Sequence, residues 1–206
     1  MTVLYDYWRS SASYRVRIAL NLAGIAHQLV PMDLAAGAQK TPDHLARNPQ
    51  GLVPVLEIDG LRLTQSLAII EYLNDRHGLN LLPDDPGERA RVRAVAHAIA
   101  VDIHPVCNLG VVAHVAELAP SPTVKTDWMR RFIHPGLCAV ERLLAGFEQA
   151  PFATGSRLSL VDLCLIPQLY NATRWDVPLD GMPRISAVGQ ACNAHPAFVA
   201  AAPKLA

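Results

Sequence analysis

The order of strand-like and helix-like segments before residue 80 limits the fold more than any other feature of this sequence. Short apolar runs alternate with helix-like runs, and Asp59-Gly60 between two apolar runs is a strong signal for a two-residue hairpin turn. The order through His77 is β-α-β-α-β-β-α. Such an order predicts a sheet with helices packed on both of its faces.

Beyond residue 80 the pattern changes. Residues 81–87 are rich in Pro and Asp, which is typical of a linker, and only helix-like segments follow. We therefore predict an α/β plus all-α fold: a thioredoxin-like domain at 1–80, a linker at 81–87 and an all-helical domain at 88–206. The expected strands are 3–8, 27–32, 52–58 and 61–63, and the expected helices are 14–23, 42–47, 67–77, 88–118 with a bend at Pro105, 123–147, 160–174 and 183–193.

Composition excludes several classes of function. The 18 basic residues balance the 18 acidic ones and form no basic run, which argues against binding to nucleic acid. Charge or proline interrupts each apolar stretch before it reaches the length of a transmembrane helix, and the N-terminus lacks the pattern of a signal peptide. We expect a soluble, cytoplasmic protein that binds neither nucleic acid nor membranes.

Cysteine and histidine spacing gives no sign of a metal site. The four cysteines are far apart in the sequence, and no histidine pair has the spacing of a zinc site. We expect no metal and four reduced thiols in apolar surroundings. These cysteines are Cys107, Cys138, Cys164 and Cys192.

A serine-rich turn stands between the first predicted strand and the first predicted helix. It runs from Arg9 to Ser13 and includes Ser10 and Ser11. A helix N-terminus presents unpaired N–H groups, and serine hydroxyls add donors beside them, so an anion such as a thiolate is a suitable ligand. The alternative is that these serines cap the helix and do nothing else.

A second serine, Ser159, precedes the predicted helix at 160–174. Asp162 follows three residues later, which is the spacing of a capping box, and Leu158 with Leu163 has the spacing of a hydrophobic staple. We interpret this motif as a folding device without chemistry.

Several motifs in order resemble one known family over essentially the whole chain. A thioredoxin-like half followed by a helical half with an S-x-x-D box resembles the glutathione transferases, and the motifs are closest to the zeta class, which includes the maleylacetoacetate isomerases. The matching segments are Arg9–Leu20, Asn48–Pro54, Gln65–Leu73, Asp102–Pro105, Leu163–Gln168 and Asn171–Arg174.

The resemblance implies that the protein uses glutathione. Val53 would precede the family's cis-proline and pair with the cysteinyl backbone of glutathione, while Gln65 and Ser66 would hold the γ-glutamyl carboxylate. The alternatives are a trans proline at Pro54 and simple helix capping at 65–66; His104 could equally be a buried histidine. The full implied set of glutathione contacts is Ser10, Ser11, Ala12, Ser13, Tyr14, Arg15, Gln39, Val53, Gln65, Ser66, His104, Asn108, Leu109 and Gly110.

The resemblance also implies a reaction. The glutathione thiolate, favoured by a hydrogen bond from Ser10 or Ser11, would add to the cis double bond of a maleyl diketo acid, the new single bond would rotate, and elimination would leave the trans isomer. Arg9 and Arg174 would anchor the carboxylates of the substrate, unless they form structural salt bridges instead. The sequence does not decide which serine acts.

The resemblance leaves the substrate open. Maleylacetoacetate is the first expectation, maleylpyruvate is the next, and a transferase or dehalogenase of small α-halo acids would share the thiolate step. Two positions depart from the family pattern: Ala12 replaces a common cysteine and Gly110 a polar or basic residue. A homodimer is implied. The alternative from another class is a glutathione-transferase-like binding protein without turnover.

Overall fold

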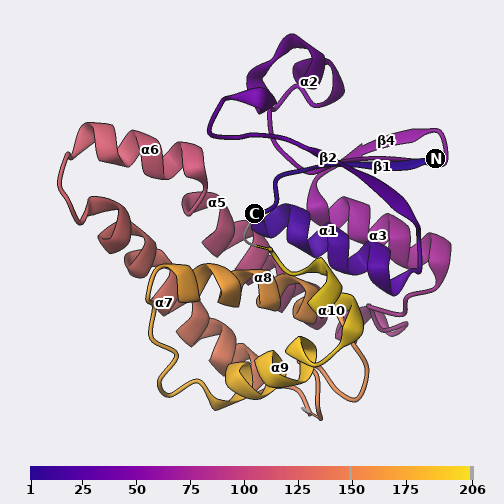
Figure 1. Ribbon diagram of the computed structural model, residues 1–206. Helices are drawn as coiled ribbons and strands as arrows, with labels where there is room; N and C mark the ends of the chain where they lie inside the picture. Colours follow the sequence, from indigo (N-terminus) through magenta and orange to yellow (C-terminus); the bar gives the residue numbers. More distant parts are fainter. Residues whose placement is uncertain (149, 205–206) are drawn as a thin grey trace. The chain divides into compact units, whose positions relative to one another are not determined.

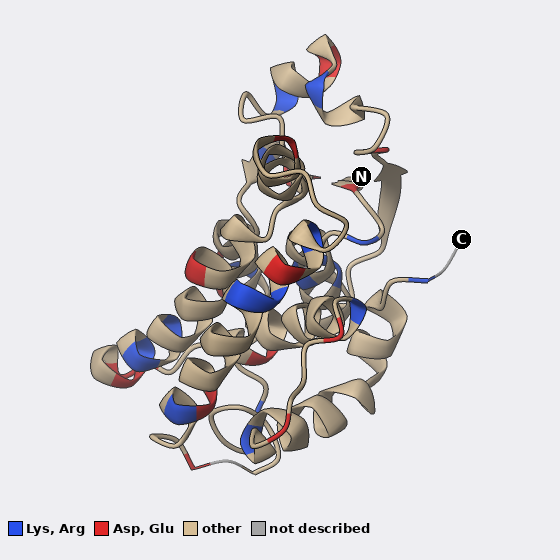
Figure 2. Cartoon of the chain, turned by 90° about the vertical axis from the view of Figure 1, so that its left-hand side faces the viewer, with Lys and Arg blue, Asp and Glu red and all other residues tan. Residues whose placement is uncertain are grey.

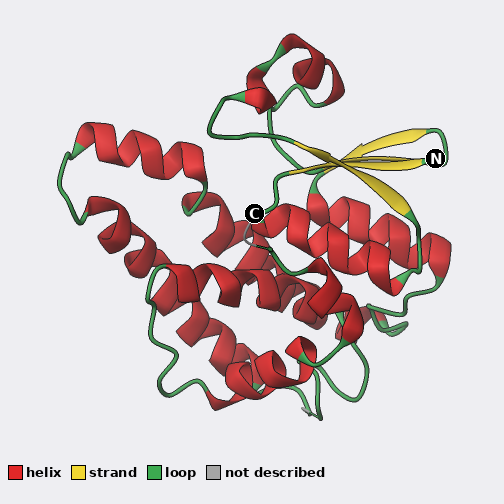
Figure 3. Ribbon diagram, in the orientation of Figure 1, coloured by secondary structure: helices red, strands yellow, loops and turns green. Residues whose placement is uncertain are grey.

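The computed structural model describes residues 1–148 and 150–204, which form two compact units. The first unit joins Met1–Leu79 with the C-terminal residues 195–204, and the second is Asn80–Ala194. All strands of the described residues lie in the first unit (Figure 3). The end of the predicted helical domain at residue 206 lies outside the described residues, and its described C-terminal part groups with the first unit instead.

The first unit is built on a four-stranded mixed sheet with the strand order β2-β1-β3-β4. β1 and β2 are parallel, whereas β3 is antiparallel to both β1 and β4. In the register, Leu4 of β1 stands between Leu29 of β2 and Leu56 of β3. The strands are β1 (Thr2–Asp6), β2 (His27–Pro31), β3 (Val55–Ile58) and β4 (Leu61–Thr64).

Helices cover both faces of this sheet, as the predicted order requires. The helices α1 and α3 lie side by side below the sheet in Figure 1, and α2 lies on its other side. The helices α1 and α3 pack on each other and bury Ile18, Leu20 and Ile70, and each such side chain stabilises the fold by about 1.5–3 kcal/mol. These elements are α1 (Ser11–Leu22), the short 3₁₀ helix η1 (Ala38–Lys40), α2 (Pro42–Arg47) and α3 (Ser66–His77).

The predicted strand at 52–58 is wrong at its beginning. β3 begins at Val55, and the peptide bond between Val53 and Pro54 is cis. The carbonyl of Leu52 accepts hydrogen bonds from His44 Nε2 and Asn48 Nδ2, both at 2.9 Å, so this stretch pairs with side chains of the α2 region and not with a strand. The cis form expected at Pro54 is confirmed.

The last helix of the chain, α10 (Pro196–Ala201), packs on α1. Its backbone carbonyls accept hydrogen bonds from three α1 side chains: Tyr14 Oη donates to Phe198, Arg17 Nε to Ala201 and Asn21 Nδ2 to Ala197. The sequence did not predict this helix, because a six-residue segment rich in alanine carries no clear helical period.

The second unit is helical throughout its secondary structure apart from one isolated bridge, Phe152 with Gly155. The predicted single bent helix at 88–118 is wrong: a π-helical segment precedes Pro105, and the helix breaks at Cys107–Asn108. Proline lacks an N–H and clashes with the carbonyl of the preceding turn, which explains the local change of helix type. The elements are α4 (Pro86–His97), η2 (Ala98–Ile103), α5 (His104–Val106), α6 (Leu109–Leu118), α7 (Val124–Leu144), α8 (Leu160–Arg174) and α9 (Pro183–Asn193).

One glycine explains how α7 approaches the π-helical segment. A Cβ atom at Gly136 would stand 2.5 Å from both Cγ1 and Cδ1 of Ile103. Glycine is unfavourable inside a helix, so its presence here is explained by the close approach and not by helix propensity. The predicted helix at 123–147 is confirmed despite its Pro135-Gly136 pair.

The predicted capping box is also confirmed. Asp162 accepts hydrogen bonds from the backbone N–H of Ser159 at 2.8 Å, from the Ser159 hydroxyl at 2.7 Å and from the backbone N–H of Ala153 at 2.8 Å. Its carboxylate is fully buried. This aspartate therefore joins the start of α8 to the segment before it.

Charged residues of both signs are interspersed along the ribbon (Figure 2), as expected for a zero net charge. No single helix of the described residues is long and apolar enough to cross a membrane, although Pro86–Val106 and Leu109–Leu118, bent by 40°, pass the length and hydropathy test as a pair. Within the same residues, no three His, Cys, Asp or Glu side chains form a group that could hold a metal ion. All four cysteines are free.

Candidate active site

The serine turn at the start of α1 is the centre of the candidate site. Ser10 is the N-cap of α1, and its Oγ accepts a hydrogen bond from the backbone N–H of Ser13 at 3.2 Å. Ser10 is partly exposed, whereas Ser11 is only 8% exposed. Because the oxygen of Ser10 is engaged as an acceptor, its proton is available to a ligand, and the first amides of α1 point the same way.

Arg9 stands beside this turn and is held by two aromatic rings. Its Nη2 donates to the hydroxyl of Tyr7 at 3.3 Å, and its guanidinium carbon lies 5.1 Å from the ring centre of Trp8 and 6.0 Å from that of Tyr7. Cation–π contacts of this kind hold a guanidinium without neutralising its charge. Arg9 thus keeps a positive charge next to Ser10.

A second helix N-terminus of the first unit carries Gln65 and Ser66. Ser66 is buried, and its Oγ accepts a hydrogen bond at 3.1 Å from Nη1 of Arg15, which is 2% exposed. Gln65 has φ 68° and ψ 111°, a conformation that a residue other than glycine adopts at an energetic cost. A buried guanidinium behind a helix N-terminus makes this position attractive to a carboxylate.

The turn at 48–51 brings two further glutamines to the same region of the first unit. Gln65 Nε2 donates to Gln50 Oε1 at 2.8 Å. Gly51 has φ 62°, and a Cβ there would stand 3.0 Å from the carbonyl oxygen of Gln39. Gln39 Oε1 is buried and accepts no hydrogen bond from the described residues, which is an unusual state for a buried amide oxygen.

A buried carboxylate lies behind the serine turn. Burial raises the pKa of Asp6, and the neighbouring guanidinium of Arg17 opposes that rise. Arg17 Nη1 donates to Asp6 Oδ1 at 2.6 Å, and both side chains are less than a tenth exposed. The carboxylate is therefore paired with a cation within the fold.

The remaining predicted residues lie in the second unit. His104 is the first residue of α5 and follows the π-helical segment, and Asn108 is the N-cap of α6, with Leu109 and Gly110 in the first turn of that helix. π-Helical insertions are frequent at functional sites. A Cβ at Gly110 would meet no atom within 4 Å, so the position has room for the larger residue of the family pattern.

Arg174 is the last residue of α8 and is exposed. Its Nη1 donates to Asn171 Oδ1 at 3.5 Å, and its guanidinium carbon lies 5.8 Å from the ring centre of Trp175. The guanidinium of Arg174 therefore lies at the surface, beside an amide and an aromatic ring.

The structure brings together the predicted site residues of the first unit at two helix N-termini and the loops beside them. The side chains of Ser13, Tyr14 and Arg15 are buried. Sequence reasoning missed Gln50 and His44, although the Asn-Pro-Gln-Gly run carried Gln50. His44 gave no signal, because a single histidine is more often a core residue.

The comparisons with known proteins agree with this geometry. Residues 2–75 match the family model described as glutathione S-transferase, N-terminal domain. The chain is 58% identical over 204 residues to the maleylacetoacetate isomerase of Rhizobium meliloti (strain 1021), covering 98% of this chain and 96% of that protein. A solved structure of a maleylpyruvate isomerase, titled as a bacterial glutathione transferase of the zeta class, superimposes with a TM-score of 0.94 at 37% identity, covering 98% of this chain and 96% of that one. The chain belongs to the zeta class of the glutathione transferases.

A second solved structure contains a ligand. The maleylacetoacetate isomerase of Anaeromyxobacter dehalogenans 2CP-1 was crystallised with bound dicarboxyethyl glutathione and citrate; it has a TM-score of 0.87 and 40% identity, and covers 98% of this chain and 94% of that one. The family and the thioredoxin-like fold predicted from the sequence are confirmed.

Proposed function

We propose that this zeta-class protein is a glutathione-dependent cis–trans isomerase of a maleyl diketo acid, with maleylacetoacetate as its substrate. The observation that carries the proposal is the serine-capped N-terminus of α1, where the cap Ser10 is partly exposed, Arg9 precedes it and the first turn of the helix holds no acidic residue. The name of the relative that is 58% identical supports the same substrate.

The residues of the first unit fit glutathione. Ser66, with the buried Arg15 behind it, suits the γ-glutamyl carboxylate, and the buried acceptor Gln39 Oε1 suits an N–H donor of the tripeptide. Val53, partly exposed and next to β3, suits pairing with the cysteinyl backbone. The second unit adds His104, Asn108, Leu109 and Gly110 as further contacts in this proposal.

When bound, glutathione supplies the thiolate that adds to the cis double bond and leaves after rotation has produced the trans isomer. The work of Ser10 is to favour that thiolate. A thiol with a pKa near 8.5 is largely protonated at neutral pH, and each unit of depression favours ionisation by about 1.4 kcal/mol. We assign the donor to Ser10 and not to Ser11, because Ser10 is the more exposed and its hydroxyl oxygen already accepts from Ser13.

Arg9 and Arg174 are the proposed anchors for the carboxylates of the substrate. Both guanidinium groups lie against aromatic rings, Arg9 at 5.1 Å from the ring centre of Trp8 and Arg174 at 5.8 Å from that of Trp175. Guanidinium binds carboxylate through two parallel hydrogen bonds, which orients the diketo acid as well as holding it. The dicarboxyethyl glutathione of the Anaeromyxobacter dehalogenans relative is a thioether of the kind that thiol addition to a butenedioic acid forms, and this supports the addition step.

An absorbance assay tests the function. Maleylacetoacetate, maleylpyruvate and dichloroacetate are each incubated with the enzyme, with and without glutathione, and maleylacetoacetate is expected to be turned over fastest. The Ser10→Ala variant should lose about 10²–10³-fold in kcat, the usual effect of removing one preorganised hydrogen-bond donor, while Ser11→Ala should lose much less.

Two outcomes would contradict the proposal. Maleylpyruvate turned over faster than maleylacetoacetate would move the substrate to that of the solved relative with TM-score 0.94. Glutathione binding by calorimetry without turnover of any of the three acids would indicate a binding protein.

We further propose a cytoplasmic homodimer. Free cysteines suit a reducing compartment, and α6 exposes apolar side chains that a partner subunit would cover. Light scattering coupled to gel filtration should give twice the chain mass of 22.3 kDa. The exposed side chains are Leu109 (46%), Val111 (38%) and Leu118 (72%).

A further inference from the structure

A buried arginine links the serine turn to the end of the chain. Arg17 is 6% exposed, and each of its three guanidinium nitrogens donates one hydrogen bond within the first unit. Nη1 donates to Asp6 Oδ1 at 2.6 Å and Nη2 to the carbonyl of Trp8 at 3.0 Å. Nε donates to the carbonyl of Ala201 in α10 at 2.9 Å.

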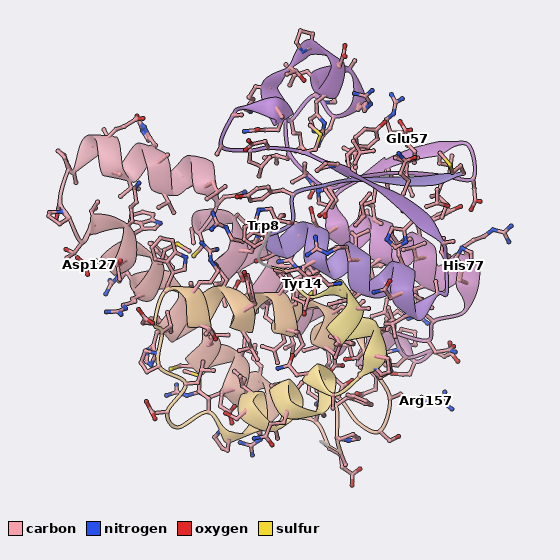
Figure 4. The ribbon with its side chains drawn as sticks, viewed as in Figure 1. Trp8, Tyr14, Glu57, His77, Asp127 and Arg157 are labelled. Atoms are coloured by element: carbon pink, nitrogen blue, oxygen red, sulfur yellow. The ribbon has the colours of Figure 1, made fainter. Side chains whose placement is uncertain are left out.

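These bonds act on the backbone that leads into the site. Trp8 is two residues before Ser10, and the backbone N–H of Ser10 donates to the carbonyl of Tyr7 at 2.8 Å. Figure 4 labels Trp8, which precedes α1, and Tyr14, which lies on α1. The guanidinium carbon of Arg17 lies 5.4 Å from the ring centre of Tyr14. The backbone between β1 and Ser10 is therefore fixed by two hydrogen bonds, one from the Ser10 N–H to the Tyr7 carbonyl and one from Arg17 to the Trp8 carbonyl.

The positive charge of Arg17 is paired with a carboxylate in the interior of the first unit. The Asp6 carboxylate neutralises it at close range, and neither side chain reaches the surface. A substrate anchor needs an accessible charge, so Arg17 does not act as one. What it can supply is geometry, because a planar guanidinium with three occupied donors is fixed in both position and orientation.

We infer that Arg17 is a positioning residue for the glutathione thiol site: it holds the turn from Trp8 to Ser10, and the Ala201 carbonyl of the C-terminal helix fixes Arg17 in the orientation that does so. The inference rests on the proposed function, in which Ser10 donates to the thiol. It assigns a role in the first unit to the last helix of the chain, although 184 residues separate Arg17 from Ala201.

The first test replaces the planar group and keeps its charge. In Arg17→Lys the ammonium can remain beside Asp6, but one nitrogen cannot occupy the three donor positions of the guanidinium. We expect kcat to fall about tenfold because the hydroxyl of Ser10 is displaced, with a smaller change in the KM for glutathione. The pKa of the bound glutathione thiol, followed by thiolate absorbance, should rise.

The matched control is Asn21→Ala. Asn21 is on the same helix and donates to Ala197 of the same C-terminal helix at 3.0 Å, but it makes no bond to the turn. It should lower the melting temperature slightly and leave kcat and the thiol pKa unchanged. An Arg17→Lys enzyme with the kcat and thiol pKa of the wild type would overturn the inference, whatever its melting temperature.

A pair of truncations tests the Ala201 carbonyl while Asp6 and Arg17 stay intact. A chain ending at Ala202 keeps the Ala201 peptide carbonyl, and a chain ending at Ala200 lacks it. We expect wild-type turnover from the first and a loss similar to that of Arg17→Lys from the second. Equal turnover by the two truncated chains would contradict the role of α10, and this pair decides the question if Arg17→Lys does not fold.

Amide hydrogen exchange gives a readout that does not depend on turnover. The amides of Ser10 to Tyr14 should exchange faster in the chain ending at Ala200 than in the chain ending at Ala202, and equal rates would contradict the inference. A wild-type enzyme without glutathione-dependent turnover would reject the proposed function, while the exchange rates would still report on Arg17.

Discussion

Two helices of this protein begin with a serine cap, yet only one of them suits a ligand. At α8 the third helical residue is Asp162, which is buried and accepts hydrogen bonds from the Ser159 N–H and hydroxyl. At α1 the third helical residue is Ser13, and the cap Ser10 is partly exposed. A carboxylate already occupies the positive end of α8, whereas the end of α1 remains available to an anion. The residue at the third position, more than the cap, distinguishes the capping box of α8 from the candidate binding site at α1.

The two helix N-termini should also have opposite effects on the pKa of a nearby thiol. Cys192 donates to Asp162 Oδ1 at 3.6 Å, and burial, followed by the charge of Asp162, raises the pKa of Cys192 far above its ordinary value. A thiol placed at α1 would meet a hydroxyl and amides, which lower its pKa. We therefore expect the N-terminus of α8 to keep a nearby thiol neutral and the N-terminus of α1 to favour a thiolate.

The largest effect is expected from removing the carboxylate of the capping box at the start of α8. Asp162→Ala would leave the N–H groups of Ala153 and Ser159 buried without acceptors, at a cost of about 3 kcal/mol or more in the free energy of unfolding. Urea denaturation measures this loss. Asp127→Ala, which removes an exposed acid from the first turn of α7, is the control and should cost less than about 0.5 kcal/mol. Similar losses in both variants would remove the distinction between the two helices.

The next largest effect is expected from placing a carboxylate at the N-terminus of α1. In Ser10→Asp the cap is kept, since aspartate caps as well as serine, but a negative charge stands where the thiolate should lie. Stability should stay within about 0.5 kcal/mol of the wild type, while kcat/KM for glutathione should fall by about 10²-fold or more. A variant that keeps its turnover would show that α1 is only capped by Ser10.

A smaller effect is expected on the rate at which the cysteine thiols are alkylated. Cys192 should resist iodoacetamide in the native protein, and so should Cys107, whose pKa burial raises to about 11. Because the pKa of Cys107 is higher in the folded protein than the ordinary value of 9.0 for a free thiol, the stability linked to the neutral thiol is complete below pH 9 and is lost as the pH rises toward 11. Mass spectrometry of alkylated peptides should find the half-buried Cys138 modified first. Early labelling of Cys192 would contradict the comparison.

The smallest effect concerns a third helix N-terminus, that of α6. Gly110→Ala should raise the free energy of unfolding by up to about 1 kcal/mol, because glycine is unfavourable in a helix and the added Cβ meets no atom within 4 Å. Thermal unfolding measures the gain. Gly136→Ala is the matched control in another helix, and it should lose stability since its Cβ would stand 2.5 Å from Ile103.

Much of this structure could be predicted from the sequence where the signals are local. The Asp59-Gly60 hairpin and the capping box of α8 each depend on a few neighbouring residues, and both are confirmed. The predicted β-α-β-α-β-β-α order of the first unit is also observed, because each of its segments has a local pattern of apolar residues.

The parts that could not be predicted depend on distant contacts. The helix α10 is held by hydrogen bonds to α1, and the approach of α7 to Ile103 is visible only as a glycine. The early start predicted for β3 was wrong because Leu52 pairs with side chains of His44 and Asn48. The serine turn with Ser10 and Ser11 was found from the residues themselves, the other site residues came from the resemblance, and the individual role of each stays a prediction.

The grouping of α10 with the first unit bears on how the protein is made. Arg17, which is buried against Asp6 in the folded protein, is synthesised 184 residues before Ala201, its acceptor on α10. Domains usually fold in the order of synthesis. Here the hydrogen bond from Arg17 to Ala201 can form only after the whole helical unit between the two residues has been synthesised.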